Sequence, residues 1–154
     1  MTIVQYLVLV AASALLLLAA RTDLREYKIR NDLVLALAAI FVLDAVLFRP
    51  WSDIKWDLAF AALMFAMLLA VYAGGWMGGG DVKILSVAFL WSGLSGALPF
   101  AVLLALFSTA HTILAKAGLV KSQQTETARR RIPYAPSVAG ALIGVFLLRT
   151  VHLA

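Results

Sequence analysis

Six apolar runs, separated by short polar segments, make up most of the chain. They cover about residues 3–20, 33–48, 57–73, 82–91, 97–115 and 133–153. A helix that crosses ~30 Å of hydrocarbon needs about 20 residues at 1.5 Å per residue, and five of the runs reach or approach that length. The fourth run is short. We expect it to tilt, to extend through Ser92 and Gly93, or to lie inside the bundle behind other helices.

The segments between the runs carry turn and loop residues. Arg49-Pro50-Trp51 and the segment 92–96 predict tight turns. Longer polar connections are expected near residues 21–32, 74–81 and 116–132. The pattern predicts an all-α integral membrane protein, a bundle of about six transmembrane helices that forms a single domain over residues 1–154.

Composition supports this assignment. Hydrophobic residues make up 64% of the chain, and the mean hydropathy is +0.97, whereas soluble domains are about half apolar. The chain has no cysteine, which excludes a cysteine nucleophile and a cysteine-based zinc site, and its two histidines are far apart in sequence. We therefore expect neither a metal site nor a cofactor.

The basic residues are distributed unevenly between the two ends of the predicted bundle. With six spans, one side would hold ten of them: Arg21, Arg25, Lys28, Arg30, Lys83, Lys116, Lys121, Arg129, Arg130 and Arg131. The other side would hold three: Arg49, Lys55 and Arg149.

The positive-inside rule places the side with ten basic residues in the cytoplasm and both termini outside, in the periplasm of a bacterial cell. A five-helix arrangement with a re-entrant fourth segment would move the basic segment 116–131 outside, so the charge distribution argues against it. The net charge of +5 is explained by membrane topology, and we expect no nucleic acid partner.

Two aspartates, Asp23 and Asp81, lie at the predicted cytoplasmic edge of the apolar runs. Ionisable groups at membrane depth are costly and mark candidate functional sites. Taken alone, Asp23 fits an acid of a solvated loop better than a site residue, and Asp81 is equally consistent with a helix N-cap that follows Gly78-Gly79-Gly80. We expect these glycines to adopt positive φ and to let another chain approach closely.

Three motifs resemble those of the type IV prepilin peptidases. Asp23, five residues and then Ile29-Arg30-Asn31 resembles their first active-site motif, although Arg30 stands where proline is frequent. The segment Gly78-Gly79-Gly80-Asp81-Val82-Lys83 resembles their second motif, Gly-x-Gly-Asp with a following lysine. Ile132-Pro133-Tyr134-Ala135-Pro136 is similar to the segment that opens their last helix.

The resemblance implies a membrane aspartyl endopeptidase of the inner membrane, with Asp23 and Asp81 as the catalytic pair at the cytoplasmic face. Its partners would be the bilayer and a prepilin or pseudopilin substrate, whose basic leader is removed. Gly78 and Gly80 would shape the loop that presents Asp81, and Lys83 and Asn31 would be supporting residues. The sequence makes no prediction about oligomeric state.

The size of the chain resembles the short subgroup that serves tight-adherence and Flp-type pili. Larger family members carry a cytoplasmic insertion with a four-cysteine zinc site and an N-methyltransferase activity. This chain has neither the insertion nor cysteine, so we expect cleavage without methylation.

The helix dipoles suggest roles for the two carboxyl groups. A helix N-terminus favours negative charge, and Asp81 begins a helix whereas Asp23 follows the end of one. This favours Asp81 as the base and Asp23 as the acid. The positive charges of Arg21 and Arg25 would instead favour the ionised form of Asp23. His111 is read as a packing or loop-facing residue.

Two alternatives remain open from the sequence. A presenilin-like intramembrane aspartyl protease also uses Gly-x-Gly-Asp, but its first aspartate lies inside a helix after tyrosine. A non-catalytic membrane scaffold of a pilus or secretion machine would use the same acids only as helix caps.

Overall fold

The fold is a bundle of six helices. The computed structural model describes residues 2–118, 123–124, 130–131 and 133–151. The helices are α1 (Ile3–Glu26), α2 (Asn31–Phe48), α3 (Trp51–Ala73), α4 (Gly79–Ser92), α5 (Ala97–Lys116) and α6 (Ala135–Thr150). A short antiparallel pairing joins β1 (Gln123–Gln124) to β2 (Arg130–Arg131). The prediction of an all-α bundle with six helices is confirmed for the described part of the chain.

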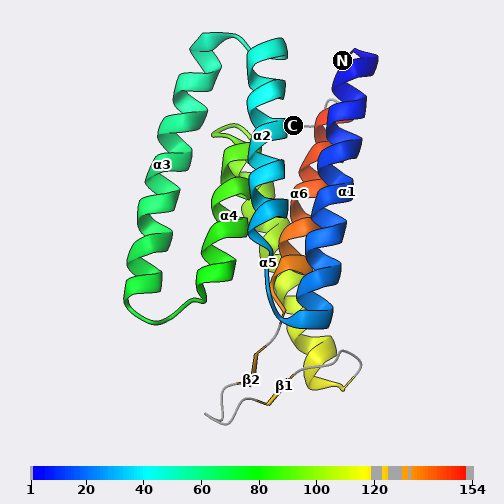
Figure 1. Ribbon diagram of the computed structural model, residues 1–154, viewed down its shortest axis with the longest axis vertical. Coiled ribbons are helices and arrows are strands. Elements are labelled where there is room, and N and C mark those ends of the chain that lie inside the picture. The colour runs from blue at the N-terminus through cyan, green and yellow to red at the C-terminus, as the bar shows by residue number, and fades with distance from the viewer. Residues whose placement is uncertain (1, 119–122, 125–129, 132, 152–154) are drawn as a thin grey trace.

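The helices alternate in direction, so that successive connections lie at opposite ends (Figure 1). The end of α1 and the starts of α2, α4 and α6 lie at the lower end in this view. The α2–α3 and α4–α5 turns lie at the upper end, together with the start of α1. We call these the lower end and the upper end of the bundle from here on.

Helix α4 lies at the centre of the bundle. It packs against α2, α3, α5 and α6, while α1 packs against α2 and α6. Trp91 of α4 is fully buried and donates its indole N–H to the carbonyl of Leu37 at 3.0 Å. Its ring also packs edge-on against Phe41 of α2 and Phe146 of α6. These contacts fix α4 between two neighbours, as expected for a short helix enclosed by longer ones.

Four helices, α1, α2, α3 and α5, are long and apolar enough to cross a membrane by length and composition. Most of their large apolar side chains point outward, for example Leu35 at 68% exposure and Leu98 at 75%. Exposing this surface to water would cost free energy, whereas lipid tails are as apolar as leucine side chains and can cover it. The multi-pass membrane character is thus supported. That all six helices cross, and that the termini face the periplasm, remain predictions.

Local signals explain where the helices at the lower end begin and end. Tyr27 adopts a left-handed backbone with φ of 52°, which ends α1 at Glu26. The helix is thus longer than the first apolar run, and only residues 27–30 connect it to α2. The expected connection near 116–132 lies mostly outside the described residues.

Candidate active site

Asp23 lies in the last turn of α1 and faces inward. Its exposure is 6%, while Arg21 and Arg25 on the same turn are exposed. Its side chain is therefore held by a helix rather than carried on a solvated loop. The structure gives no ion pair between Asp23 and these two arginines in the described part of the chain.

The partner of Asp23 comes from α6. The carboxylate accepts a hydrogen bond from the backbone N–H of Ala135, the first residue of α6, at 2.9 Å. Helix α6 has no side-chain cap of its own, since its N-cap residue Tyr134 has a helical backbone. Asp23 thus supplies from α1 the acceptor that an N-cap side chain normally provides. Pro136, at the second position, has no N–H to satisfy.

Asp81 lies in the first turn of α4. Gly78 is the N-cap residue, and the N–H of Asp81 donates to the carbonyl of Gly78 at 3.1 Å. The Asp81 carboxylate folds back over the same glycine, so that a Cβ at position 78 would lie 3.3 Å from Oδ2. The side chain is half-buried. A side chain at position 78 would therefore crowd the carboxylate.

The glycine run has a different role from the one expected. Residues 78–80 do not have positive φ, because they form the cap and first turn of a right-handed helix. The positive φ of this segment belongs to Gly75, at 73°. Close approach is observed: Cβ atoms at Gly79 and Gly80 would lie 3.4 Å from Tyr72 and 3.6 Å from Ile29.

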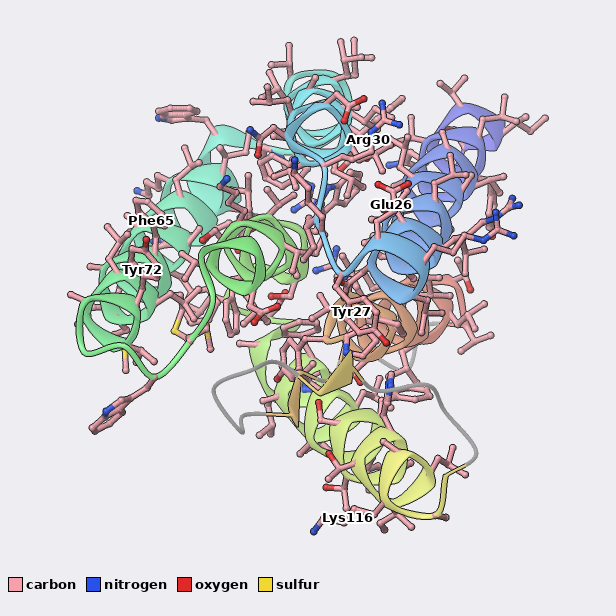
Figure 2. All side chains as sticks on the ribbon, turned by 60° about the horizontal axis from the view of Figure 1, so that its bottom comes forward. Glu26, Tyr27, Arg30, Phe65, Tyr72 and Lys116 are labelled. Carbon is pink, nitrogen blue, oxygen red and sulfur yellow. The ribbon has the colours of Figure 1, made fainter. Side chains whose placement is uncertain are left out.

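Lys83 and Asn31 are in contact. The Lys83 Nζ donates to Oδ1 of Asn31 at 3.0 Å and joins α4 to the first residue of α2. The buried side chain of Ile29 lies against Gly80, one turn nearer the start of α4 than Lys83 is. The connection that follows α1 is therefore anchored on the start of α4. Figure 2 looks onto this end, where Tyr27 and Arg30 mark the connection and Tyr72 lies on α3.

The two aspartates thus share the lower end of the bundle. Asp23 makes its hydrogen bond to α6, and α6 packs against both α1 and α4. Both carboxyl groups lie at helix N-termini, Asp23 at that of α6 and Asp81 in that of α4. The dipole argument that made Asp81 the base and Asp23 the acid therefore fails, because a helix N-terminus stabilises negative charge at both positions.

His111 of α5 is a residue that the sequence did not single out as part of the site. It lies near enough to Asp23 for a charged imidazole to act on that carboxylate. Its Nε2 is buried and has no hydrogen-bond partner in the described part of the chain, and the same holds for Ser108 Oγ one turn earlier. A buried polar atom without a partner costs about 1–3 kcal/mol. The available signal was a histidine within a mostly apolar helix.

The described residues contain no group of three or more His, Asp or Glu side chains placed to hold a metal ion. The chemistry that the lower end offers is that of two carboxyl groups, one buried and one half-buried, with a lysine and an amide nearby. Such a set can exchange protons with a substrate and with water.

Comparison with protein families gives one match. The type IV leader peptidase family model matches residues 10–114, which span α1 to α5 and include both aspartates, Asn31 and Lys83. The segment that opens α6 lies beyond the matched region. The chain matches neither a curated protein nor a solved structure.

Proposed function

Because the chain belongs to the type IV leader peptidase family, we propose that it is an aspartic endopeptidase that removes the basic leader from type IV prepilins or pseudopilins. Family membership supports a protease whose partner is a prepilin-like protein. The aspartic mechanism, the cytoplasmic side of cleavage and the inner-membrane location are our proposals from the residues.

The placement of Asp23 carries the proposal. A carboxylate with 6% exposure, held against the N-terminus of a neighbouring helix, is costly to bury and has a fixed position. The second carboxyl group, Asp81, lies at the same end of the bundle, at the start of the central helix. Two positioned carboxyl groups supply the base and the acid that peptide hydrolysis without a metal requires.

The proposed reaction uses one carboxylate to take a proton from water while the water oxygen attacks the scissile carbonyl carbon. The other carboxyl group, protonated, donates to the carbonyl oxygen. A proton then returns to the leaving nitrogen as the C–N bond breaks, which releases the leader and the mature N-terminus. Like charges held close do not both ionise easily, so the pair would share one proton and titrate as a unit.

The position of the site suits a substrate that is half in the membrane. The lower end carries most of the basic residues, so it faces the cytoplasm by the positive-inside rule. A prepilin has its basic leader in the cytoplasm and its apolar helix in the bilayer, and the boundary between them lies at this depth. We propose that lateral diffusion brings this boundary to the start of α4. Without cysteine or a cytoplasmic insertion, the enzyme would cleave and not methylate.

The test is co-expression of the full chain with a candidate prepilin, followed by N-terminal sequencing of the product. Asp23→Asn and Asp81→Asn should each abolish cleavage while the protein still inserts. Asp32→Asn is the matched control, because Asp32 is an exposed acid of the same end that pairs with Arg30. Full activity in either catalytic variant would refute the aspartic mechanism, and a loss in EDTA that zinc restores would indicate metal chemistry.

Asp23→Asn also separates catalysis from a scaffold role. The amide oxygen can still accept the Ala135 N–H, so the cap is retained while the acid–base function is lost. A scaffold whose acids only cap helices would tolerate this change, and normal pilus assembly with Asp23→Asn would favour that alternative.

A further inference from the structure

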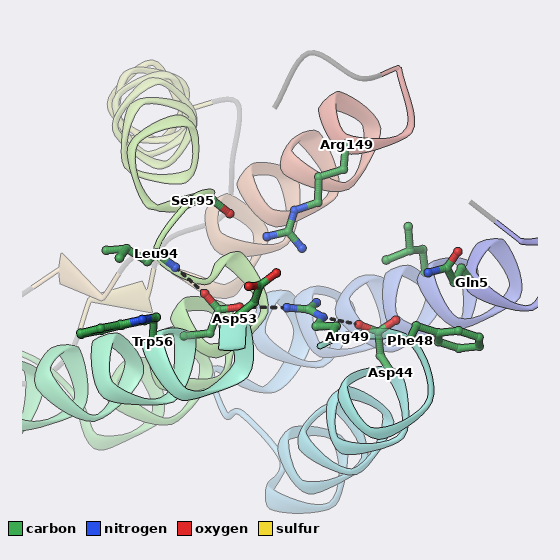
Figure 3. Close-up of a pocket in the computed structure, with 11 residues that line it drawn as sticks. Gln5, Asp44, Phe48, Arg49, Asp53, Trp56, Leu94, Ser95 and Arg149 are labelled. Atoms are coloured by element: carbon green, nitrogen blue, oxygen red, sulfur yellow. Dashed lines mark hydrogen bonds and ion pairs between the residues drawn. The ribbon is translucent and has the colours of Figure 1, made fainter. Parts of the chain in front are cut away.

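A cavity of about 840 Å³ opens at the upper end of the bundle, away from the two aspartates, and Figure 3 shows the side chains that line it. It is lined from α1, α2, α3, the α4–α5 turn and α6. Its walls include three carboxylates and two guanidinium groups: Asp44, Asp53, Asp57, Arg49 and Arg149. Burying a charge is costly unless it is paired, and Asp44, Asp57 and Arg49 are largely buried, which makes the cluster a candidate site in its own right.

Three of these charges are satisfied within the protein. Arg49 donates to Asp44 at 2.8 Å and to Asp57 at 3.2 Å, and all three side chains are largely buried. Asp57 also accepts the backbone N–H of Leu94 at 2.9 Å. This network ties α2 and α3 to the α4–α5 turn, and it needs no ligand to explain it.

Two opposite charges are left over. Arg149 donates to the carbonyl of Ser92 and points into the cavity, and it makes no ion pair with any described residue (Figure 3). Asp53 is an exposed acid in the first turn of α3 at the rim of the cavity; it accepts only the hydroxyl of Ser52 at 2.9 Å among the described residues and makes no ion pair with a described cation. Both line the same cavity but are not within ion-pair distance of each other.

The cavity is also partly apolar, and two aromatic side chains contribute to its lining. Leu9, Phe48, Trp56 and Leu94 contribute to its walls. Trp56 is 61% exposed, and Trp51 at the start of the same helix is 70% exposed. Tryptophans that lie at the end of an apolar helix mark the depth of the lipid headgroups. The polar ligand most abundant at that depth is a phospholipid headgroup.

We propose that this cavity binds the headgroup of a zwitterionic phospholipid, with the phosphate on Arg149 and the ammonium on Asp53. The cavity lining carries two guanidinium groups against three carboxylates, so an anion alone would enter a site with an excess of negative charge, and a phosphate without its ammonium is disfavoured. A headgroup that carries both charges can form an ion pair with Arg149 and another with Asp53. The guanidinium fork suits a phosphate, and the apolar wall receives the start of an acyl chain.

The experiment is native mass spectrometry of the full chain in detergent. Phosphatidylethanolamine, phosphatidylglycerol, phosphoethanolamine and inorganic phosphate are titrated separately. We expect phosphatidylethanolamine to be retained about two- to fivefold more strongly than phosphatidylglycerol, in line with one lost ion pair to an exposed carboxylate. Phosphoethanolamine or phosphate bound as well as the lipid would overturn the lipid assignment. Equal retention of the two lipids would overturn the role of Asp53.

Variants locate the site. Asp53→Asn should remove the preference for phosphatidylethanolamine, and Arg149→Gln should weaken the retention of both lipids. Arg149→Lys should keep part of that retention, because the charge remains while the fork is lost. Lys55→Gln is the matched control, since that ammonium lies over the Trp56 ring outside the ion-pair network. If Arg149→Gln does not fold, Asp53→Asn and Arg149→Lys still decide. Wild-type preference in Asp53→Asn together with wild-type retention in Arg149→Lys would refute the site.

Discussion

The carboxylate of Asp23 and the backbone N–H of Ala135 are joined by a hydrogen bond of 2.9 Å across 112 residues of sequence. This one contact fixes the end of α1 to the beginning of α6. Asp23, which we expect to be catalytic, therefore has a structural role as well. A substitution at position 23 therefore acts on stability and on chemistry, and the two effects are separable by the choice of side chain.

Asp23→Ala should destabilise the protein, and Asp23→Asn should do so much less. Loss of a helix cap costs about 0.5–2 kcal/mol, whereas asparagine keeps an acceptor oxygen for the Ala135 N–H. Thermal unfolding in detergent checks this expectation. Both variants should lack leader cleavage. Equal stability of Asp23→Ala and the wild type would show that the cap contributes nothing.

Gly78→Ala should lower kcat more than Gly80→Ala does. A Cβ at position 78 would lie 3.3 Å from Oδ2 of Asp81 and displace the carboxylate by a few tenths of an ångström, while one at position 80 would make an ordinary 3.6 Å contact with Ile29. Misplacement of a reacting group by a fraction of an ångström reduces rate without preventing folding. Steady-state cleavage of a prepilin measures the difference.

The same pair of variants carries its own stability control. Position 80 is in the first turn of α4, where alanine is favoured over glycine by up to about 1 kcal/mol. Gly80→Ala should therefore be at least as stable as the wild type. A loss of cleavage in Gly80→Ala as large as that in Gly78→Ala would contradict the steric argument and indicate that substrate needs both glycines.

The Lys83–Asn31 hydrogen bond should contribute little to stability. Both side chains are exposed, and exposed polar pairs contribute about 0.2–1 kcal/mol. A double-mutant cycle with Lys83→Met and Asn31→Ala should give a coupling energy in that range. If the variants lose far more cleavage activity than stability, Lys83 and Asn31 act on the substrate. If activity and stability fall by similar amounts, the role of the two residues is only to join α2 to α4.

Single cysteines introduced into this cysteine-free chain test the orientation. Trp76→Cys, at 83% exposure in the α3–α4 connection, should react with a membrane-impermeant thiol reagent only from the cytoplasm. Leu94→Cys, at 55% exposure at the upper end, should react only from the periplasm. Labelling in the reverse sense would invert the topology, and labelling of both from one side would contradict the alternation of the helices.

Periodicity and charge predicted the helices and their number because those signals are local. The number and order of the helices, and the placement of the Asp23 and Asp81 segments at one end, follow from apolar runs separated by turns. The match over residues 10–114 confirms the family that the motifs suggested. These features depend on residues close to one another in sequence.

The remaining features depend on contacts that no local pattern contains. The extension of α1 through Asp23 was not expected, because a short basic stretch after an apolar run predicts a loop. The group that contacts Asp23, the N-terminus of α6, is distant in sequence. The glycines at 78–80 were expected at positive φ, which a helix start does not require. The unpaired charges of Arg149 and Asp53 come from distant helices, so sequence alone could not bring them to one cavity.

The shortness of α4 has a consequence for how the protein is made. Its 14 residues rise only about 21 Å, less than the hydrocarbon thickness, and most of them are buried against other helices. Such a segment gains little from entering lipid alone. It depends on α3, to which residues 74–78 join it and against which it packs, so insertion of the two as a hairpin is favoured. The helix that carries Asp81 is therefore the one whose membrane placement depends on assembly, and mutations on the facing surface of α3 should reduce the amount of inserted protein.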